Sequence, residues 1–420
     1  MASVVAPLRI LILAWEYPPR IIGGLGRHVA ALARNLAQQG HIVHVVTRAH
    51  HDETPTDSIE HGVHVVRVED SPAGIPFSDL LPWVLAFNNR VAAVAHRIVR
   101  DQGLDIVHAH DWLVAHAAIG VVETWDLPLA ATMHATEYGR HQGNLPGEIQ
   151  RTIHRTEGWL VERADVVVTC SRYMRTQVSD LFGHPDNIVV IPNGVDLADF
   201  AVDVDEVGAY RASLTGPRTR MVLFAGRLEY EKGVQTLLDA LADVRARVGP
   251  TVCFVAGVGT YSQVLRRRVA ELGLRRHVRF TGFLHDDDLR RHYAAADVAV
   301  TPSIYEPFGL VAVEAMACGT PVVVSDTGGL TEIVANGAGL LVPPDQPEAL
   351  ADRLVEVLSD PQLSQRLVEE GRRRIAARYD WSKVAERTAR ALNETIAGRP
   401  PQAARVATGG SVALSRPEAG

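Results

Sequence analysis

The sequence predicts an α/β protein with two doubly wound halves, each a parallel sheet covered by helices. Short β-branched runs alternate with segments of helical spacing, and this alternation restarts after a polar stretch at 199–220. A length of 420 residues also favours two cores over one. Because ligands bind beyond the carboxyl ends of the strands in such sheets, we expect the site in the loops there.

The first half is predicted as strands and helices in alternation, with the segment 15–24 as a loop and 51–61 as a polar loop or hairpin tip. Apolar residues at i, i+3 and i+7 mark its first helix, which is expected to run from Gly26 to the stop signal at Gly40. The expected strands are 8–15, 41–48, 62–68, 104–111, 127–135, 164–171 and 187–191, and the other expected helices are 83–100, 146–163 and 172–182.

The second half repeats the pattern, and its segment 301–325 reads as strand end, loop, helix and strand. Expected strands are 221–227, 251–257, 277–283, 297–303 and 321–325, with helices between them and one more at 380–397. We therefore predict domains at 1–198 and 199–379, a helix at 380–397 that crosses back to the first domain, and a disordered tail at 398–420.

Composition excludes several classes of function. A net charge of −7 argues against nucleic acid as a partner. Cys170, Cys253 and Cys318 are few and far apart, which suits buried fillers in a reducing compartment, and no histidine or cysteine spacing indicates a metal site. No leader or membrane-spanning run is evident, so a cytoplasmic location is expected.

The strongest motif is Glu306-Pro-Phe-Gly-Leu310, with Glu314 eight residues after Glu306. Glu306 stands just before a helix N-terminus, where Gly309 permits close backbone approach. A carboxylate there suits sugar hydroxyls or a developing positive charge, because it would repel a phosphate. The alternative is a helix cap and a surface charge.

This segment resembles the E-x7-E signature of retaining nucleotide-sugar glycosyltransferases of the GT-B fold, above all glycosyltransferase family 4. That fold has two Rossmann-like domains facing across a cleft, and the resemblance spans about residues 8–395. Gly23 and Gly24 resemble the family's glycine loop, and Ile21 replaces the lysine of family 5. Both glycines could also form a plain tight turn.

Arg227 and Lys232 are two cations at a strand end and a helix start. The run Gly226–Gly233 resembles the family motif G-R-x4-K-G, whose cations bind the diphosphate. Fixed cations would stabilise the charge that grows on the departing diphosphate. The alternative is a solvated surface pair.

Several strand-end residues are further candidates. His134 matches the family position that contacts the donor sugar, and Asp111 with Trp112 resembles a sugar-side or acceptor loop. Asn193, in IPNGVD, matches a motif at the interdomain edge. Trp112 could equally be a core anchor, and Asn-Gly is also ordinary turn chemistry.

The resemblance implies metal-independent retaining transfer from a nucleotide diphosphate sugar. Glu306 would bind sugar hydroxyls and Glu314 the ribose, while Arg227, Lys232 and the amides near Phe308–Leu310 would hold the diphosphate. His134 would orient the sugar, and the leaving phosphate would accept the acceptor's proton.

The motifs WEYPPxxxGGLGRHV, HAHDW and IPNGVD resemble bacterial glycogen-synthase-like α-glucosyltransferases. We therefore expect ADP- or UDP-glucose as donor and an α-1,4-glucan as acceptor. One alternative is a mannosyl- or N-acetylglucosaminyltransferase acting on a lipid, thiol or cell-wall precursor. A second is a sugar-nucleotide epimerase or binding protein of the same fold. Nothing in the sequence indicates the oligomeric state.

Overall fold

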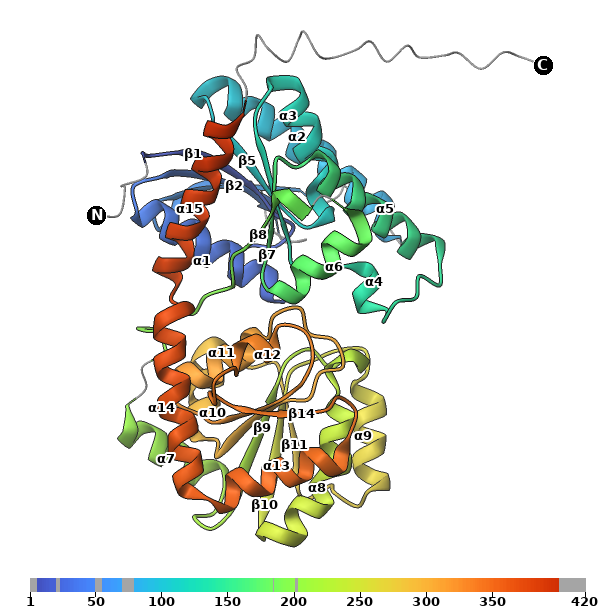
Figure 1. Cartoon of the computed structure of the whole chain (residues 1–420), viewed down its shortest axis with the longest axis vertical. Coiled ribbons are helices and arrows are strands. Elements are labelled where there is room, and N and C mark those ends of the chain that lie inside the picture. Colours follow the sequence, from blue (N-terminus) through green and yellow to red (C-terminus); the bar gives the residue numbers. More distant parts are fainter. Residues whose placement is uncertain are drawn as a thin grey trace, which may run out of the picture.

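Two α/β halves, each built on one sheet, make up the part of the chain that the computed structural model describes (Figure 1). Described are residues 6–19, 23–49, 55–69, 79–183, 185–200 and 203–399. Ile21 and the predicted tail from residue 400 onward lie outside the described residues. The GT-B arrangement that the sequence predicts is thus visible as two sheets with their helices.

The first sheet has the order β3-β4-β2-β1-β5-β6-β7-β8 within the described residues. All its pairs are parallel except β3 with β4. The strands are β1 (Arg9–Leu13), β2 (Ile42–Arg48), β3 (Thr56–Glu60), β4 (Val63–Val68), β5 (Ile106–His110), β6 (Leu129–Met133), β7 (Val166–Thr169) and β8 (Ile188–Val190). The central strands are almost wholly buried, as expected for parallel strands covered on both faces.

The strand β3 corrects the prediction of a polar loop or hairpin tip at 51–61. Its residues carry no apolar pattern because it is an exposed edge strand, held by its ladder with β4. Side-chain pairs across that ladder add to the pairing: Arg67 bonds to Glu60, and His64 lies 2.5 Å from the Asp57 carboxylate. A polar edge strand gives little signal in a single sequence.

The helices of the first half match most of the expected segments. They are α1 (Gly24–Gln38), α2 (Leu80–Gln102), α3 (Ala115–Trp125), α4 (Glu137–Arg140), α5 (Glu148–Arg163) and α6 (Arg172–Phe182), with short 3-10 turns at Trp112–Val114 and Pro185–Asn187. Two differences stand out. The helix α1 begins at Gly24 rather than Gly26, and α3 was not predicted because its apolar residues lack a clear polar face.

The second sheet is parallel throughout its described strands, in the order β11-β10-β9-β12-β13-β14. Its strands are β9 (Arg220–Ala225), β10 (Thr251–Ala256), β11 (Val278–Gly282), β12 (Val298–Thr301), β13 (Val322–Ser325) and β14 (Leu340–Val342). Its helices are α7 (Val204–Leu214), α8 (Val234–Val248), α9 (Ser262–Glu271), α10 (Asp286–Ala295), α11 (Leu310–Ala317), α12 (Leu330–Ile333), α13 (Pro347–Ser359) and α14 (Pro361–Arg378), with a 3-10 turn at Tyr230–Lys232.

The chain passes between the halves near Val195 and again near Asp380, and the two passages are hydrogen bonded to each other. The Val195 amide donates to the Tyr379 carbonyl at 2.7 Å, and the Trp381 amide donates to the Val195 carbonyl. The helix α15 (Trp381–Gly398) then lies along α1 of the first half (Figure 1). The domain boundaries at 198/199 and 379/380 remain a proposal, to which these passages lie close.

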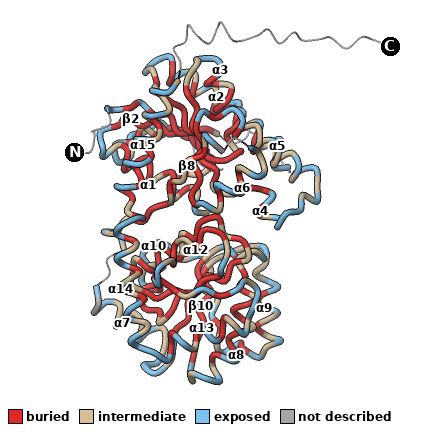
Figure 2. The backbone as a smooth tube through the Cα atoms, in the orientation of Figure 1, coloured by how far each residue is buried: buried red, intermediate tan, exposed pale blue. Residues whose placement is uncertain are grey.

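Buried residues fill the faces of both sheets, whereas the outer helix surfaces are exposed (Figure 2). Cys170, Cys253 and Cys318 are buried and unpaired, as predicted. The strands themselves are apolar and buried. The polar and charged side chains that could bind a ligand therefore lie in the loops at the carboxyl ends of the strands, where the two halves meet.

Candidate active site

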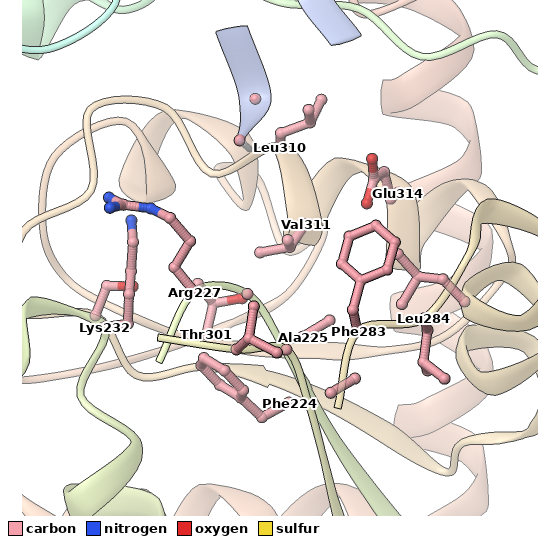
Figure 3. A pocket seen from close by; sticks show the side chains of 18 of the residues that line it. Phe224, Ala225, Arg227, Lys232, Phe283, Leu284, Thr301, Leu310, Val311 and Glu314 are labelled. Carbon is pink, nitrogen blue, oxygen red and sulfur yellow. The ribbon is translucent and has the colours of Figure 1, made fainter. Parts of the chain in front are cut away.

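A pocket that is partly open to solvent lies where the carboxyl ends of β9 to β12 face the start of α1 (Figure 3). Both halves contribute to its wall. Its polar and charged lining comes from Arg27, Arg227, Lys232, Thr301, Ser303, Glu306 and Glu314, together with the backbone of Gly23, Gly24, Gly226 and Gly257. The remainder of the wall is apolar and includes Phe224, Val258, Phe283, Leu284, Leu289, Leu310 and Val311.

Lys232 and Glu306 form an ion pair at the floor of this pocket. The ammonium Nζ lies 2.9 Å from Glu306 Oε2, which also accepts a hydrogen bond from Ser303 Oγ at 3.3 Å. Both side chains are mostly buried, at 16% and 13% exposure. The sequence assigned Lys232 to the diphosphate of a donor and Glu306 to its sugar. Because the structure brings the two side chains into contact, the charge of each one acts on a ligand bound at the other.

Glycines at two positions make this approach possible. Gly233 has φ +69, and a Cβ there would lie only 1.9 Å from the Pro302 carbonyl oxygen, so only glycine lets the Lys232 loop reach the Glu306 loop. Gly309, at φ +108, precedes α11, and a Cβ there would collide with Leu330. Gly233 and Gly309 therefore permit the backbone conformations that the loops of Lys232 and Glu306 adopt.

Arg227 is the second cation, and its guanidinium points toward the same region as the Lys232 ammonium (Figure 3). It is about half exposed and lies 3.3 Å from Glu231. The chain contains only two lysines, Lys232 and Lys383, among 42 basic residues. Lys232 therefore differs in kind from the arginine beside it, because its ammonium is a compact point charge whereas the guanidinium of Arg227 is a planar fork.

Glu314 is a buried carboxylate on α11 that already has partners. Its Oε1 accepts from Arg27 Nη1 at 3.0 Å, and its Oε2 accepts from the Tyr293 hydroxyl at 3.1 Å. Burial raises the pKa of Glu314, and Arg27 opposes that shift. Arg27 comes from α1 and also contacts Asp286 at 2.6 Å, so it joins the two halves across the pocket.

We expect Arg27→Met to lower the free energy of unfolding by about 2–3 kcal/mol, because it leaves the Glu314 carboxylate buried without its cation. The matched variant is Arg34→Met on the same helix, whose partner Asp196 is far more exposed, and it should cost less than about 1 kcal/mol. Urea unfolding measures both. Equal losses would show that the Arg27 bridge contributes no more than a surface pair.

Gly23 and Gly24 open α1 at the rim of the pocket. Among the residues that the structure describes, a Cβ at Gly23 would meet no atom within 4 Å, and a Cβ at Gly24 would meet only Leu310 at 3.8 Å, so packing against these residues does not require either glycine. The Gly23 amide donates to Glu16 Oε2 at 3.2 Å. The open space is what a ligand approaching the backbone would fill.

His134 and Asp111 lie at the ends of β6 and β5 and are linked. The His134 amide donates to Asp111 Oδ1 at 2.8 Å, and His134 Nε2 lies 3.1 Å from His110 Nδ1. Burial lowers the pKa of His134 to about 3 and raises that of Asp111 to about 6. The imidazole is therefore neutral near pH 7, and the Asp111 carboxylate holds the His134 backbone. Neither residue lines the pocket described above.

Three other predicted residues occupy different surroundings. Trp112 is 5% exposed and packs in the core, so its position agrees with a core anchor rather than with a sugar-side residue. The Phe308 ring is likewise in the core, edge-on to Tyr379. Asn193 lines a second pocket beside the first and accepts a hydrogen bond from His28 Nδ1 at 2.8 Å.

Because Trp112 packs in the core, Trp112→Phe should lower the free energy of unfolding by about 1–3 kcal/mol through the volume it removes. The KM for an acceptor should stay unchanged. Unfolding curves and acceptor titrations on the same preparation check this. A raised acceptor KM with normal stability would instead give Trp112 the sugar-side role.

Sequence reasoning missed several pocket residues. Phe283 and Val258 follow β11 and β10, line the pocket and expose 54% and 57% of their surface, which is unusual for apolar side chains. Ser303 and Arg27 supply polar contacts. The only available signal was position, since three of the four follow strand ends and Arg27 follows the glycine loop.

Comparison with known proteins places this geometry in a family. Residues 22–199 match the model described as Glycosyltransferase Family 4, and residues 210–374 match the model described as Glycosyl transferases group 1. A glycogen synthase of Mycobacterium tuberculosis is 40% identical over 409 residues, covering 94% of this chain and 97% of that protein. The chain belongs to glycosyltransferase family 4. The predicted retaining hexosyltransferase class is thereby confirmed.

This family 4 glycosyltransferase is also similar to a further relative in sequence and to a solved structure. A D-inositol 3-phosphate glycosyltransferase of Jonesia denitrificans is 34% identical and covers 86% of this chain and 89% of that protein. The solved structure of sucrose-phosphate synthase from Thermosynechococcus elongatus has a TM-score of 0.81 at 28% identity, covering 93% of this chain and 99% of that one. The predicted GT-B fold is confirmed.

Helices of the described part of this family 4 enzyme are either too short or too polar to traverse a lipid bilayer. This agrees with the sequence, where no run of apolar residues reaches the length that a spanning helix requires.

Proposed function

We propose that this family 4 enzyme transfers glucose, with retention, from ADP-glucose or UDP-glucose to an α-1,4-glucan. The observation that carries the proposal is the Lys232–Glu306 contact within one pocket. It sets a cation for a diphosphate against a carboxylate for a sugar. The glucan acceptor is supported by the near full-length similarity to a glycogen synthase.

The pocket supports one placement of the donor. The diphosphate would lie against Lys232 and Arg227, near the start of α11. Phe283 and Val258 offer apolar surface to the nucleobase, while Glu314 would accept hydrogen bonds from the ribose. Since Glu314 is already bonded to Arg27 and Tyr293, the ribose would use its remaining lone pairs or replace Arg27.

The reaction would break the bond between the anomeric carbon and the diphosphate oxygen. Negative charge then grows on the diphosphate, where the two cations stabilise it without moving. The acceptor hydroxyl forms the new bond on the same face and gives its proton to the departing phosphate oxygen. Glu306 would hold sugar hydroxyls, and the neutral His134 imidazole would orient the sugar by hydrogen bonding.

A second acceptor class is favoured by one observation. Relatives described as D-inositol 3-phosphate glycosyltransferases are 33–34% identical over most of their length, so a small phosphorylated polyol is the alternative to a glucan. Membership of family 4 removes the epimerase alternative. The glucan and the phosphorylated polyol differ in charge and size, so one experiment can separate these two acceptor classes.

That experiment is a grid of donors and acceptors. Purified protein is given ADP-glucose, UDP-glucose, GDP-mannose or UDP-N-acetylglucosamine with either a maltooligosaccharide or inositol 3-phosphate, and both nucleotide and product are followed. Glucan lengthening from a glucose donor is expected. Product only on inositol 3-phosphate, or only from a mannose or N-acetylglucosamine donor, would replace the proposal.

A further inference from the structure

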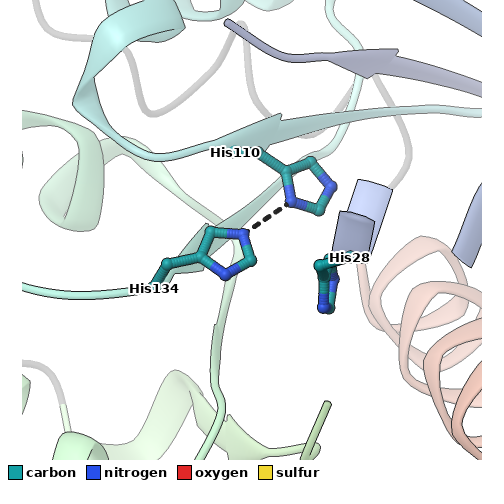
Figure 4. A group of neighbouring side chains, drawn as sticks. All are labelled: His28, His110 and His134. Atoms are coloured by element: carbon teal, nitrogen blue, oxygen red, sulfur yellow. Dashed lines mark hydrogen bonds between the residues drawn. The ribbon is translucent and has the colours of Figure 1, made fainter. Parts of the chain in front are cut away.

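A cluster of three histidines lies where α1, β5 and β6 meet, and none of the three lines the donor pocket. His28 comes from α1, His110 ends β5 and His134 follows β6 (Figure 4). One ring nitrogen from each lies within 4.8 Å of the other two. His28 and His110 are 5% and 0% exposed, and His134 is half-buried. Nothing in the transfer chemistry proposed above uses His28 or His110.

The spacing of these nitrogens is close to that of a metal site. His110 Nδ1 and His134 Nε2 are 3.1 Å apart (Figure 4). Two imidazole nitrogens on one tetrahedral zinc ion, each about 2.0–2.1 Å from the metal, are separated by about 3.3–3.4 Å. These two nitrogens share a hydrogen bond, so an ion would displace the proton between them and both rings would turn their lone pairs toward it. The third nitrogen, within 4.8 Å of the other two, would need to shift by up to about 1.4 Å to complete the face.

His28 is prepared for such a role by its other ring nitrogen. Its Nδ1 lies 2.8 Å from Asn193 Oδ1, an oxygen that can only accept, so Nδ1 carries the proton and Nε2 carries the lone pair. That Nε2 is buried and has no hydrogen-bond partner among the residues that the structure describes. An amide oxygen that fixes the tautomer of a histidine is the usual outer support of a metal ligand.

We propose that His28, His110 and His134 bind one divalent transition-metal ion of the zinc class. Three neutral imidazoles suit zinc, cobalt, nickel or copper and do not suit magnesium or calcium. The cluster borders the second pocket, which His28 and Asn193 line together with Gly194 and Trp381. The fourth position is left to water.

The ion acts as an inhibitor of transfer. Coordination occupies a ring nitrogen of His134 and fixes its ring toward His28 and His110, so the ring is lost to the sugar. This consequence rests on the role proposed for His134, whereas the binding itself rests only on the cluster. Metal-independent transfer, which the family resemblance implies, stays a prediction that this site does not oppose.

Cobalt binding tests the site directly. Untagged protein, dialysed against chelator, is titrated with Co²⁺, and the visible d–d bands of a tetrahedral cobalt centre are recorded. We expect one equivalent to bind, Zn²⁺ to displace it, and Mg²⁺ to have no effect. His28→Gln and His134→Gln should each weaken binding by more than about 100-fold, since loss of an outer support alone costs about 10–100-fold.

The matched control is His277→Gln, a partly exposed histidine of the second half, which should bind cobalt as the unaltered protein does. Circular dichroism shows which variants fold, and either cluster variant suffices. Absence of a stoichiometric tetrahedral spectrum, or its survival in a folded cluster variant, overturns the proposal. One equivalent of Zn²⁺ should also stop nucleotide release, and because the spectrum needs no substrate, a wrong substrate assignment would leave it intact.

Discussion

Lys232→Ala is expected to reduce kcat/KM for transfer by about 10²–10³-fold, the usual cost of removing one fixed electrostatic group from a transition state. The ammonium lies 2.9 Å from Glu306 on the pocket floor and is 16% exposed, so no solvent cation can replace it readily. The loss should appear in kcat and also in the affinity for the free nucleoside diphosphate. Steady-state kinetics and calorimetric titration measure these two effects.

The chain supplies its own control, because Lys383 is its one other lysine and bonds to the Ala376 carbonyl far from the pocket. Lys383→Ala should leave both quantities unchanged. Lys232→Arg should restore little, since a planar guanidinium does not fit where Gly233 brings two loops together. Full activity of Lys232→Ala in a folded protein would exclude a part for this lysine in diphosphate departure.

Glu306→Gln is expected to lower kcat by about 10²–10³-fold while the affinity for the nucleoside diphosphate is kept or rises. The reason is the geometry: the carboxylate neutralises Lys232 and faces the space where a sugar would lie, so its loss frees the ammonium for phosphate. Kinetics give the first quantity and calorimetry with nucleotide alone gives the second.

Glu356→Gln, on the exposed side of α13, is the matched control and should behave as the unaltered enzyme. The double variant Lys232→Ala with Glu306→Gln should lose less than the sum of the single losses, since the two groups are in contact. Strictly additive losses, or a Glu306→Gln enzyme with normal kcat, would contradict the shared role.

Local patterns predicted most strands correctly because buried parallel strands are mostly continuous apolar runs, as in β1, β7 and β13. These patterns failed where the polarity of a segment does not follow the periodicity of its helix or strand. The edge strand β3 is polar, and the helix α3 is apolar on most of its surface, so neither shows the period of its own structure. Trp112 shows a similar limit of local patterns. Its neighbours in the HAHDW motif do not predict whether its ring packs in the core or contacts a ligand.

The sequence by itself determined the fold class and the charged motifs at strand ends, because each of those motifs is contiguous in the chain and follows a recognisable apolar strand. Only the tertiary structure decided which of them meet. Lys232 and Glu306 are 74 residues apart and meet because β9 and β12 are neighbours in the second sheet. Arg27 and Glu314 are 287 residues apart and meet because the two halves pack together. The histidine cluster likewise joins α1 to β5 and β6. Side chains brought together by long-range packing leave no spacing that a single sequence can reveal.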